Sequence, residues 1–224
     1  GELMTSATIT DRLVSLSRAL IGRIRGGLAQ VNVLVSMFFA GMNGSVVADT
    51  ATVGALVLPA MKKAGYPAAF SAAVTGVSST IGGIIPPSIM MIVLANSTEI
   101  SIAALFAAGI IPGILIGIVI MIINHYFAIK YNFERSDEPF SIRRAGKELY
   151  RSSFALLIPL VLVGSVMGGV ASVVEAGAIT AMVALFTGVF VYRTIKWKDC
   201  TGAFRRAFRN SAMVFIIIAA SGPF

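Results

Sequence analysis

The chain has 224 residues, of which 57% are hydrophobic and only 12% are charged. A soluble domain carries roughly 25% charged residues, so this composition excludes a soluble globular protein and indicates a membrane protein. The formal net charge of +8 does not indicate a nucleic-acid-binding protein, because the basic residues form short blocks between apolar runs instead of one basic face.

The beginning of the chain predicts a surface helix followed by a hairpin. Residues 1–26 are predicted to form an amphipathic helix on the membrane surface, because leucines recur at helical spacing among arginines. Residues 27–66 contain two apolar limbs around a polar tip at 43–45. The first limb, residues 27–42, is about 24 Å long as a helix, which is short of the ~30 Å hydrocarbon core.

The remaining segments follow from apolar length and from the positions of glycine, proline and basic residues. Paired glycines and prolines interrupt the apolar stretch 67–99, which is therefore predicted to be a discontinuous transmembrane helix. The rest of the chain is predicted to form, in order, a transmembrane helix (100–129), a cytoplasmic basic loop (130–151), two transmembrane helices (152–193), and a basic linker leading into a second, truncated hairpin (194–224). Because the last residues stop within an apolar segment, we expect an internal fragment of a longer protein.

The positions of the basic residues predict the topology. All 18 Lys and Arg residues fall into four blocks, located before Gly26, at 62–63, in 130–151 and in 193–209. Basic loops face the cytoplasm, so the first two blocks lie on the same side and the segment between them must enter the membrane and return. Two short limbs fit a re-entrant helical hairpin, although two shortened full spans would give the same parity. The fold class is thus an all-α polytopic membrane protein with a re-entrant hairpin and a discontinuous helix.

The two helix breaks are the candidate functional site. An unpaired backbone is tolerated at membrane depth only inside protein or beside a water-filled cavity. Free carbonyls together with Ser, Thr and Asn oxygens suit Na⁺, and the half-helix beginning near Ser88 directs its positive end toward the second break, where it suits a substrate carboxylate. The alternative is that small residues at 43–45 and 78–88 only allow close helix packing. The adjacency of a short hairpin and a broken helix favours a transport site.

Asp49 is an acid within a membrane segment, which makes it a functional candidate. It could bind a cation directly, take up protons, or hold the hairpin tip by hydrogen bonds. We favour a tip-stabilising or substrate-proximal role, which Thr50 and Ser88 would share.

A resemblance to a known family is carried by five ordered motifs. They are GGLAQVNVL at 26–34, SMFFAG at 36–41, GSVVADT at 44–50, LPAMKKAGY at 58–66 and SSTIGGIIPPS at 78–88. Together they closely resemble the large membrane subunit of the tripartite ATP-independent periplasmic (TRAP) transporters. Family members often have Thr-Pro-Thr-Glu where this chain has Ser172-Val173-Val174-Glu175.

The resemblance implies a multi-pass protein of the bacterial or archaeal inner membrane that takes up organic acids, dicarboxylate or sialic-acid-like, with Na⁺. It implies an elevator mechanism, two inverted repeats of which this chain holds the first and the start of the second, a small four-helix membrane subunit, and a periplasmic substrate-binding protein. Carried over residue by residue, it implies a first sodium site made by Asn43, Gly44, Ser45, Ser78, Ser79, Thr80, Gly82, Gly83 and Pro86. No transition metal is expected.

Two other classes of function remain as alternatives. A stand-alone elevator-type carboxylate carrier would work without a binding protein or small subunit. A membrane-embedded enzyme would need a cluster of nucleophile, metal or acid–base residues, and the chain offers one His, one Cys and isolated intramembrane acids. We therefore expect no enzymatic activity.

Overall fold

The computed structural model describes residues 9–21, 24–133, 141–192 and 197–221, and the regular elements within these ranges are helical. They are α2 (Ile9–Ile21), α3 (Gly27–Asn43), α4 (Val46–Lys63), α5 (Ala68–Ser79), a 3₁₀ turn (Thr80–Gly83), α6 (Ile89–Thr98), α7 (Ile102–Lys130), α8 (Ile142–Met167), α9 (Val173–Phe186) with a π-helical end (Thr187–Val191), and α10 (Trp197–Ser221). Three stretches are long and apolar enough to cross a membrane, namely α7, α8 and Val173–Val191. The prediction of an all-helical protein with several membrane-spanning helices is confirmed for the described residues.

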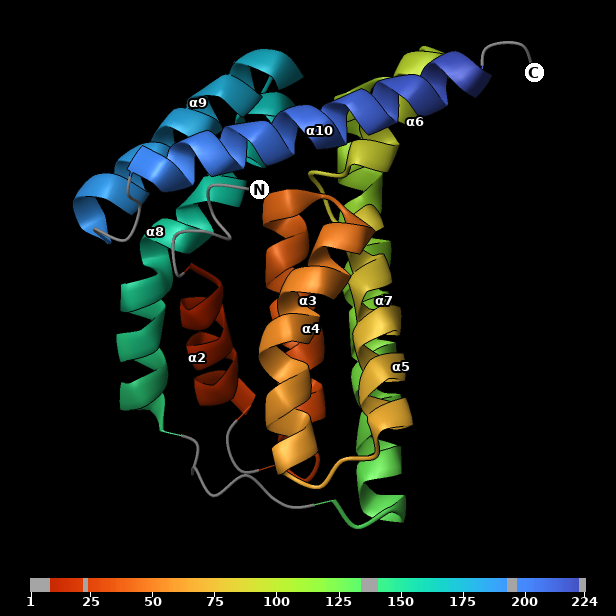
Figure 1. Cartoon of the computed structure of the whole chain (residues 1–224), viewed down its shortest axis with the longest axis vertical. Helices are drawn as coiled ribbons and strands as arrows, with labels where there is room; N and C mark the ends of the chain where they lie inside the picture. The colour runs from red at the N-terminus through yellow and green to blue at the C-terminus, as the bar shows by residue number, and fades with distance from the viewer. Residues whose placement is uncertain (1–8, 22–23, 134–140, 193–196, 222–224) are drawn as a thin grey trace.

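The hairpin predicted at 27–66 is present as α3 and α4, which pack side by side (Figure 1). α3 ends at Gly44, whose left-handed backbone (φ 62°) suits glycine, and the Gly44 N–H donates to the Ala40 carbonyl. Ser45 begins α4 as its N-cap, and its side chain accepts a hydrogen bond from the Ala48 N–H. The two helices have 17 and 18 residues, so the limbs are short, and their re-entrant course stays a prediction.

The helix break predicted within 67–99 is also present. α5 ends at Ser79, a 3₁₀ turn follows, and α6 begins only at Ile89. Pro86 and Pro87 supply no N–H donor to continue the helix. Ser88 caps the new helix by accepting a hydrogen bond from the Met91 N–H.

One face of α7 supports both of these features. Three glycines four residues apart make up this face, Gly109, Gly113 and Gly117. A methyl group on Gly109 would lie 2.5 Å from the Ile84 carbonyl oxygen, and one on Gly113 would lie 2.4 Å from Ile85 Cγ1. A methyl group on Gly117 would lie 2.5 Å from Met37 Sδ. The break and α3 therefore lie directly against the α7 backbone, which only glycine permits at this distance.

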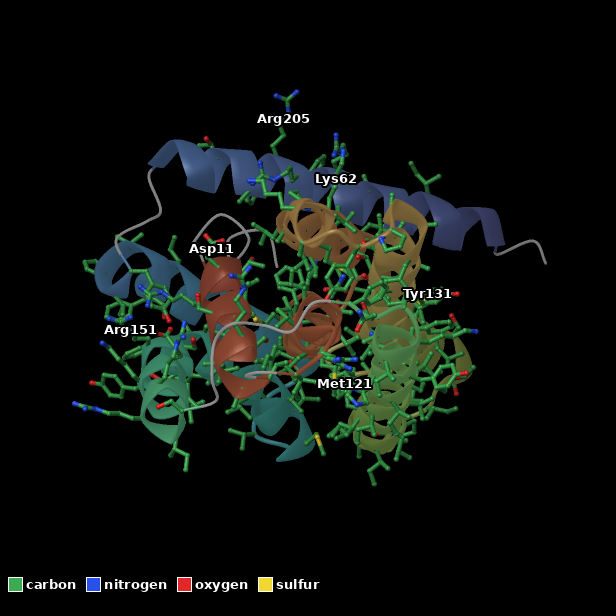
Figure 2. The ribbon with its side chains drawn as sticks, turned by 90° about the horizontal axis from the view of Figure 1, so that it is seen from below. Asp11, Lys62, Met121, Tyr131, Arg151 and Arg205 are labelled. Atoms are coloured by element: carbon green, nitrogen blue, oxygen red, sulfur yellow. The ribbon has the colours of Figure 1, made fainter. Side chains whose placement is uncertain are left out.

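The ends of the helices agree with part of the predicted topology. Figure 1 shows the α4–α5 connection, the end of α7 and the start of α8 at one end of the molecule, and the α6–α7 and α8–α9 connections at the other. Lys62 and Lys130 thus lie at the same end, as the charge pattern predicts. α10 instead crosses near the opposite end, and Arg205 projects from it away from the other helices (Figures 1 and 2). The prediction that this basic block shares the end of Lys62 is not met by its described part, residues 197–209. α9 does return along α8, because the Tyr192 hydroxyl that follows it donates to the Arg151 carbonyl of α8.

The amphipathic helix predicted in 1–26 is present as α2, but its apolar side chains face protein. Leu13 and Leu16 are 0% and 1% exposed, and α2 packs against α3 and α8. Arg12 joins α2 to the end of the π-helical segment, with its guanidinium carbon 4.3 Å above the Tyr192 ring. Leu13 and Leu16, which we expected to enter lipid, thus contribute to the protein core, whereas Leu20 on the same helix is 41% exposed. A position of α2 along the membrane surface stays a prediction.

Two predicted loops are helical. α8 begins at Ile142, so the second half of the predicted basic loop 130–151 is the first part of a helix, whereas residues 134–140 lie outside the described residues. The predicted linker and hairpin start at 194–224 form one continuous helix, α10, within its described part. The physical reason is the same in both cases. Low hydropathy marks a segment that does not cross the membrane, and such a segment can still form an amphipathic helix.

Candidate functional site

The hairpin tip packs directly on the break of the discontinuous helix. The Ile89 N–H donates a 3.1 Å hydrogen bond to the Gly44 carbonyl. A methyl group on Gly44 would lie 2.3 Å from the Pro87 carbonyl oxygen and 3.1 Å from Ser88 Cα. Two segments separated by 45 residues in the sequence are thereby joined through their backbones, and their role as a shared ion site stays a prediction.

The 3₁₀ turn lies on the other side of the tip. A methyl group on Gly82 would lie 3.7 Å from the Ser45 carbonyl and 3.8 Å from Asp49 Cβ. A methyl group on Gly83 would lie 3.3 Å from a Val46 methyl. The first turn of α4 and the end of the 3₁₀ turn are therefore in van der Waals contact, which brings together the two predicted halves of the site.

A buried polar network joins α3 to α5 behind this contact. Asn32 Nδ2 donates to Thr75 Oγ1 at 2.7 Å, and Ser78 Oγ donates to Asn32 Oδ1 at 3.5 Å. The Ser36 and Ser78 hydroxyls lie 3.3 Å apart. All four side chains are buried. A buried polar network of this kind fixes the relative position of two helices, because each partner that is lost leaves another polar group unpaired.

Asp49 and Ser79 are also buried, but their side-chain oxygens, unlike those of the network, lack hydrogen-bond partners. Asp49 is 1% exposed and Ser79 is 0% exposed. Neither carboxylate oxygen of Asp49 has a hydrogen bond of normal geometry, and the Ser79 Oγ likewise has none. The tip-stabilising role that we expected of Asp49 stays a prediction. The carboxylate points into the interior between α3, α4 and α5.

The structure divides the predicted sodium-site residues into three groups. Six of them lie where the hairpin tip packs on the break, either in the contact itself or at the helix ends beside it: Asn43, Gly44, Ser45, Gly82, Gly83 and Pro86. Ser78 and Ser79 lie deeper, the first in the network with α3 and the second beside Asp49. Thr80 is exposed and donates to the Val77 carbonyl in the last turn of α5. Thr50 is likewise exposed and donates to the Val46 carbonyl, so these two threonines point away from the contact.

The N-terminus of α6 is occupied by groups of the protein itself. Its Ile89 N–H donates to the hairpin tip, and its Met91 N–H donates to the Ser88 side chain. Ser88 Oγ also donates to the Gly83 carbonyl at 2.8 Å. The tip carbonyl thus occupies one of the donors of this half-helix, and its role in binding a substrate carboxylate stays a prediction.

Asn32, Ser36 and Thr75 are residues that sequence reasoning missed. Asn32 and Ser36 are four residues apart on α3, and Thr75 and Ser78 are three apart on α5, which places each pair on one helix face. Polar residues repeating at that spacing in otherwise apolar helices were the available signal. Among the described residues, no group of three or more His, Cys, Asp or Glu side chains is placed to hold a metal ion.

The helices and the site together define a class. Three membrane-length helices, a short hairpin and a broken helix that packs on the hairpin tip make the chain a polytopic helical membrane protein of the kind found in secondary transporters. A family model described as the DctM component of tripartite ATP-independent periplasmic transporters matches residues 1–224. The chain belongs to this family, and the resemblance noted in its motifs is confirmed.

Three relatives illustrate the family. The chain is 34% identical over 219 residues to the C4-dicarboxylate TRAP transporter large permease protein DctM of Pseudomonas aeruginosa, covering 98% of this chain and 51% of the relative. It is 33% identical to the sialic acid TRAP transporter large permease protein SiaM of Vibrio cholerae, covering 97% and 51%. It is 33% identical to the 2,3-diketo-L-gulonate TRAP transporter large permease protein YiaN of Escherichia coli, covering 99% and 52%. The chain thus spans about half the length of these relatives.

Proposed function

We propose that the chain is the first half of the membrane subunit of a secondary transporter that takes up organic acids together with Na⁺. In this proposal a periplasmic binding protein delivers the substrate, and a small four-helix membrane subunit completes the complex in the inner membrane. Relatives named for C4-dicarboxylate, sialic acid and 2,3-diketo-L-gulonate support an acidic substrate.

One observation carries the proposal, namely the packing of the hairpin tip on the helix break. The Gly44 carbonyl and the Ile89 N–H join two irregular backbone segments. Irregular backbone at membrane depth persists only inside protein or beside a water-filled cavity, and the sites of secondary transporters are typically built at such helix breaks. In an elevator mechanism the hairpin and the broken helix move as one body. The Asn32–Thr75 hydrogen bond and the support of both segments by the glycine face of α7 favour such a body.

The proposal is tested by uptake into liposomes that contain the complete transporter with its partner subunits, with and without a Na⁺ gradient. We expect uptake to require Na⁺. Ser45→Ala and Ser79→Ala should raise the Na⁺ concentration that gives half-maximal uptake, because each removes an oxygen near the tip. Ser153→Ala serves as a control, since Ser153 is exposed on α8 and donates only within its own helix. Uptake that proceeds equally without Na⁺ and is unchanged in both variants would refute the proposal.

A further inference from the structure

An open groove with a volume of about 560 Å³ runs along one face of α4. Its lining residues recur every three or four positions, as residues on one helix face do. They are Thr50, Ala51, Gly54, Ala55, Leu58, Pro59 and Lys62. The groove begins just after the N-cap Ser45 and ends one residue before the end of α4. It therefore leads from near the hairpin tip to the end of the molecule where the α4–α5 connection lies (Figure 1).

The side chains of the groove differ from those of the exposed apolar face of α7. That face presents large aliphatic side chains, such as Ile111 and Leu115, which are 68% and 56% exposed. The groove instead presents Ala51, Gly54 and Ala55. Small side chains offer lipid tails little apolar surface to cover. The composition therefore favours water or protein against this face of α4 over lipid.

Pro59 adds a polar group to the same face. It lies within α4 and has no N–H, so the Ala55 carbonyl, four residues earlier, lacks its ordinary helical donor. Both residues are exposed and line the groove. A carbonyl without a donor is costly in hydrocarbon, whereas water or a neighbouring polar group satisfies it. This second feature also excludes lipid from the groove.

Lys62 places a positive charge at the outer end of the groove. It is exposed and projects outward in Figure 2. No acidic residue is among the described residues that line the groove. An ammonium group is strongly hydrated, so its presence favours water over a packed helix, and a cation at the mouth of a cleft raises the local concentration of anions. The adjacent Lys63 is equally exposed but does not line the groove.

We propose that the groove along α4 is the path by which the substrate anion passes between the hairpin tip and the end of the protein predicted to face the cytoplasm, and that Lys62 attracts the substrate carboxylate at its mouth. This inference rests on the proposed function and deepens it, because it concerns the substrate and not Na⁺. The volume lies within the range of small-molecule sites, roughly 300–1,000 Å³. Thr50, predicted to be substrate-proximal, lies at the inner end of the path.

Cysteine labelling tests whether the groove contains water and feels the charge of Lys62. Ala55→Cys is introduced into the complete transporter in lipid nanodiscs, with Cys200 and any other cysteine replaced by serine. It is reacted with an anionic methanethiosulfonate (sulfonatoethyl) and a cationic one (trimethylammonioethyl). Both should react, and Lys62→Gln should lower the ratio of anionic to cationic rates about threefold at low ionic strength, since Lys62 lies about 10 Å further along the helix. Choline chloride at about 0.5 M should abolish that difference.

Two variants control the labelling. Lys63→Gln removes the same charge from the adjacent position, outside the groove, and should change the rate ratio much less than Lys62→Gln does. Ala51→Cys lies in the same groove and is exposed, so it provides the measurement if Ala55→Cys does not assemble.

Transport tests whether the substrate uses the path. The probe is a radiolabelled acid that wild type takes up, chosen from the C4-dicarboxylates, sialic acid and 2,3-diketo-L-gulonate named for the relatives. Lys62→Gln should raise the concentration of this acid for half-maximal transport from the side of Lys62 about threefold or more. It should leave the Na⁺ concentration for half-maximal uptake unchanged. Lys62→Arg keeps the charge and should behave as wild type.

The outcomes separate this inference from the proposed function. Sodium-independent uptake by wild type would refute the proposed function, whereas the labelling rates do not depend on it. Failure of both reagents to react with either cysteine would show that lipid or another helix fills the groove and would overturn the inference. Equal effects of Lys62→Gln and Lys63→Gln on labelling and transport would overturn the role of Lys62.

Discussion

Replacing Gly44 by alanine tests whether the hairpin tip packs on the helix break as described. Gly44 has a left-handed backbone (φ 62°), and a methyl group there would lie 2.3 Å from the Pro87 carbonyl oxygen. The left-handed conformation alone costs an alanine about 1–2 kcal/mol. Relief of the contact requires the tip to move away from the break, which weakens the hydrogen bond from the Ile89 N–H to the Gly44 carbonyl. A buried donor left unpaired costs a further 1–3 kcal/mol or so.

Gly65→Ala provides the matched control. Gly65 also has a left-handed backbone (φ 78°), but nothing lies within 4 Å of a methyl group placed on it. This variant therefore carries the conformational cost without the steric one, about 1–2 kcal/mol. The two alanine variants should differ by at least about 1 kcal/mol in the free energy of unfolding.

The assay is thermal melting of the purified complete transporter, followed by uptake into liposomes. Gly44→Ala should melt below Gly65→Ala by about 2 °C or more, and it should lose uptake, whereas Gly65→Ala should retain it. Equal melting temperatures and equal uptake in the two variants would mean that the tip does not rest on the Pro87 carbonyl, and the site geometry would then be wrong.

Two further predictions concern interactions that support the site and the scaffold. Asn32→Ala removes the hydrogen bonds to Thr75 and Ser78 and should lower the free energy of unfolding by about 1–3 kcal/mol; a melting temperature equal to that of wild type would contradict the network. Ser172→Ala removes the capping box that Ser172 forms with Glu175 at the start of α9 and should cost about 1 kcal/mol. Ser172→Thr keeps the hydroxyl and should melt like wild type, so equal losses in both variants would exclude capping as the cause.

The sequence predicted the irregular features well because their signals are local. A left-handed turn needs glycine, as at Gly44, and a helix cannot continue through Pro86 and Pro87, so the tip and the break could each be located within a few residues. The capping box at Ser172 and Glu175 is also a local feature, although it was not predicted from the sequence. Its hydroxyl and carboxylate are three residues apart, and both bond within the first turn of one helix.

The side-chain partners could not be predicted in the same way. Asn32 and Thr75 are 43 residues apart, and only the packing of α3 on α5 brings them together. The sequence likewise marked Asp49 as unusual but did not reveal that its carboxylate turns inward and stays unpaired. The helical start of α8 was missed because hydropathy detects spans, whereas residues 142–151 form a polar helix.

The fate of the carbonyls freed by the break bears on where a cation binds. The Gly83 carbonyl accepts a hydrogen bond from Ser88, the Ile84 carbonyl lies against the Gly109 backbone of α7, and the Pro87 carbonyl abuts Gly44. These oxygens are covered by protein, so in this arrangement the break does not present them as an open ring of ligands. Unused oxygen is instead found one turn deeper, at Asp49. The observed effect of the break is to let the hairpin tip seat against the start of α6, closely enough for the Gly44 carbonyl to accept a hydrogen bond from the Ile89 N–H.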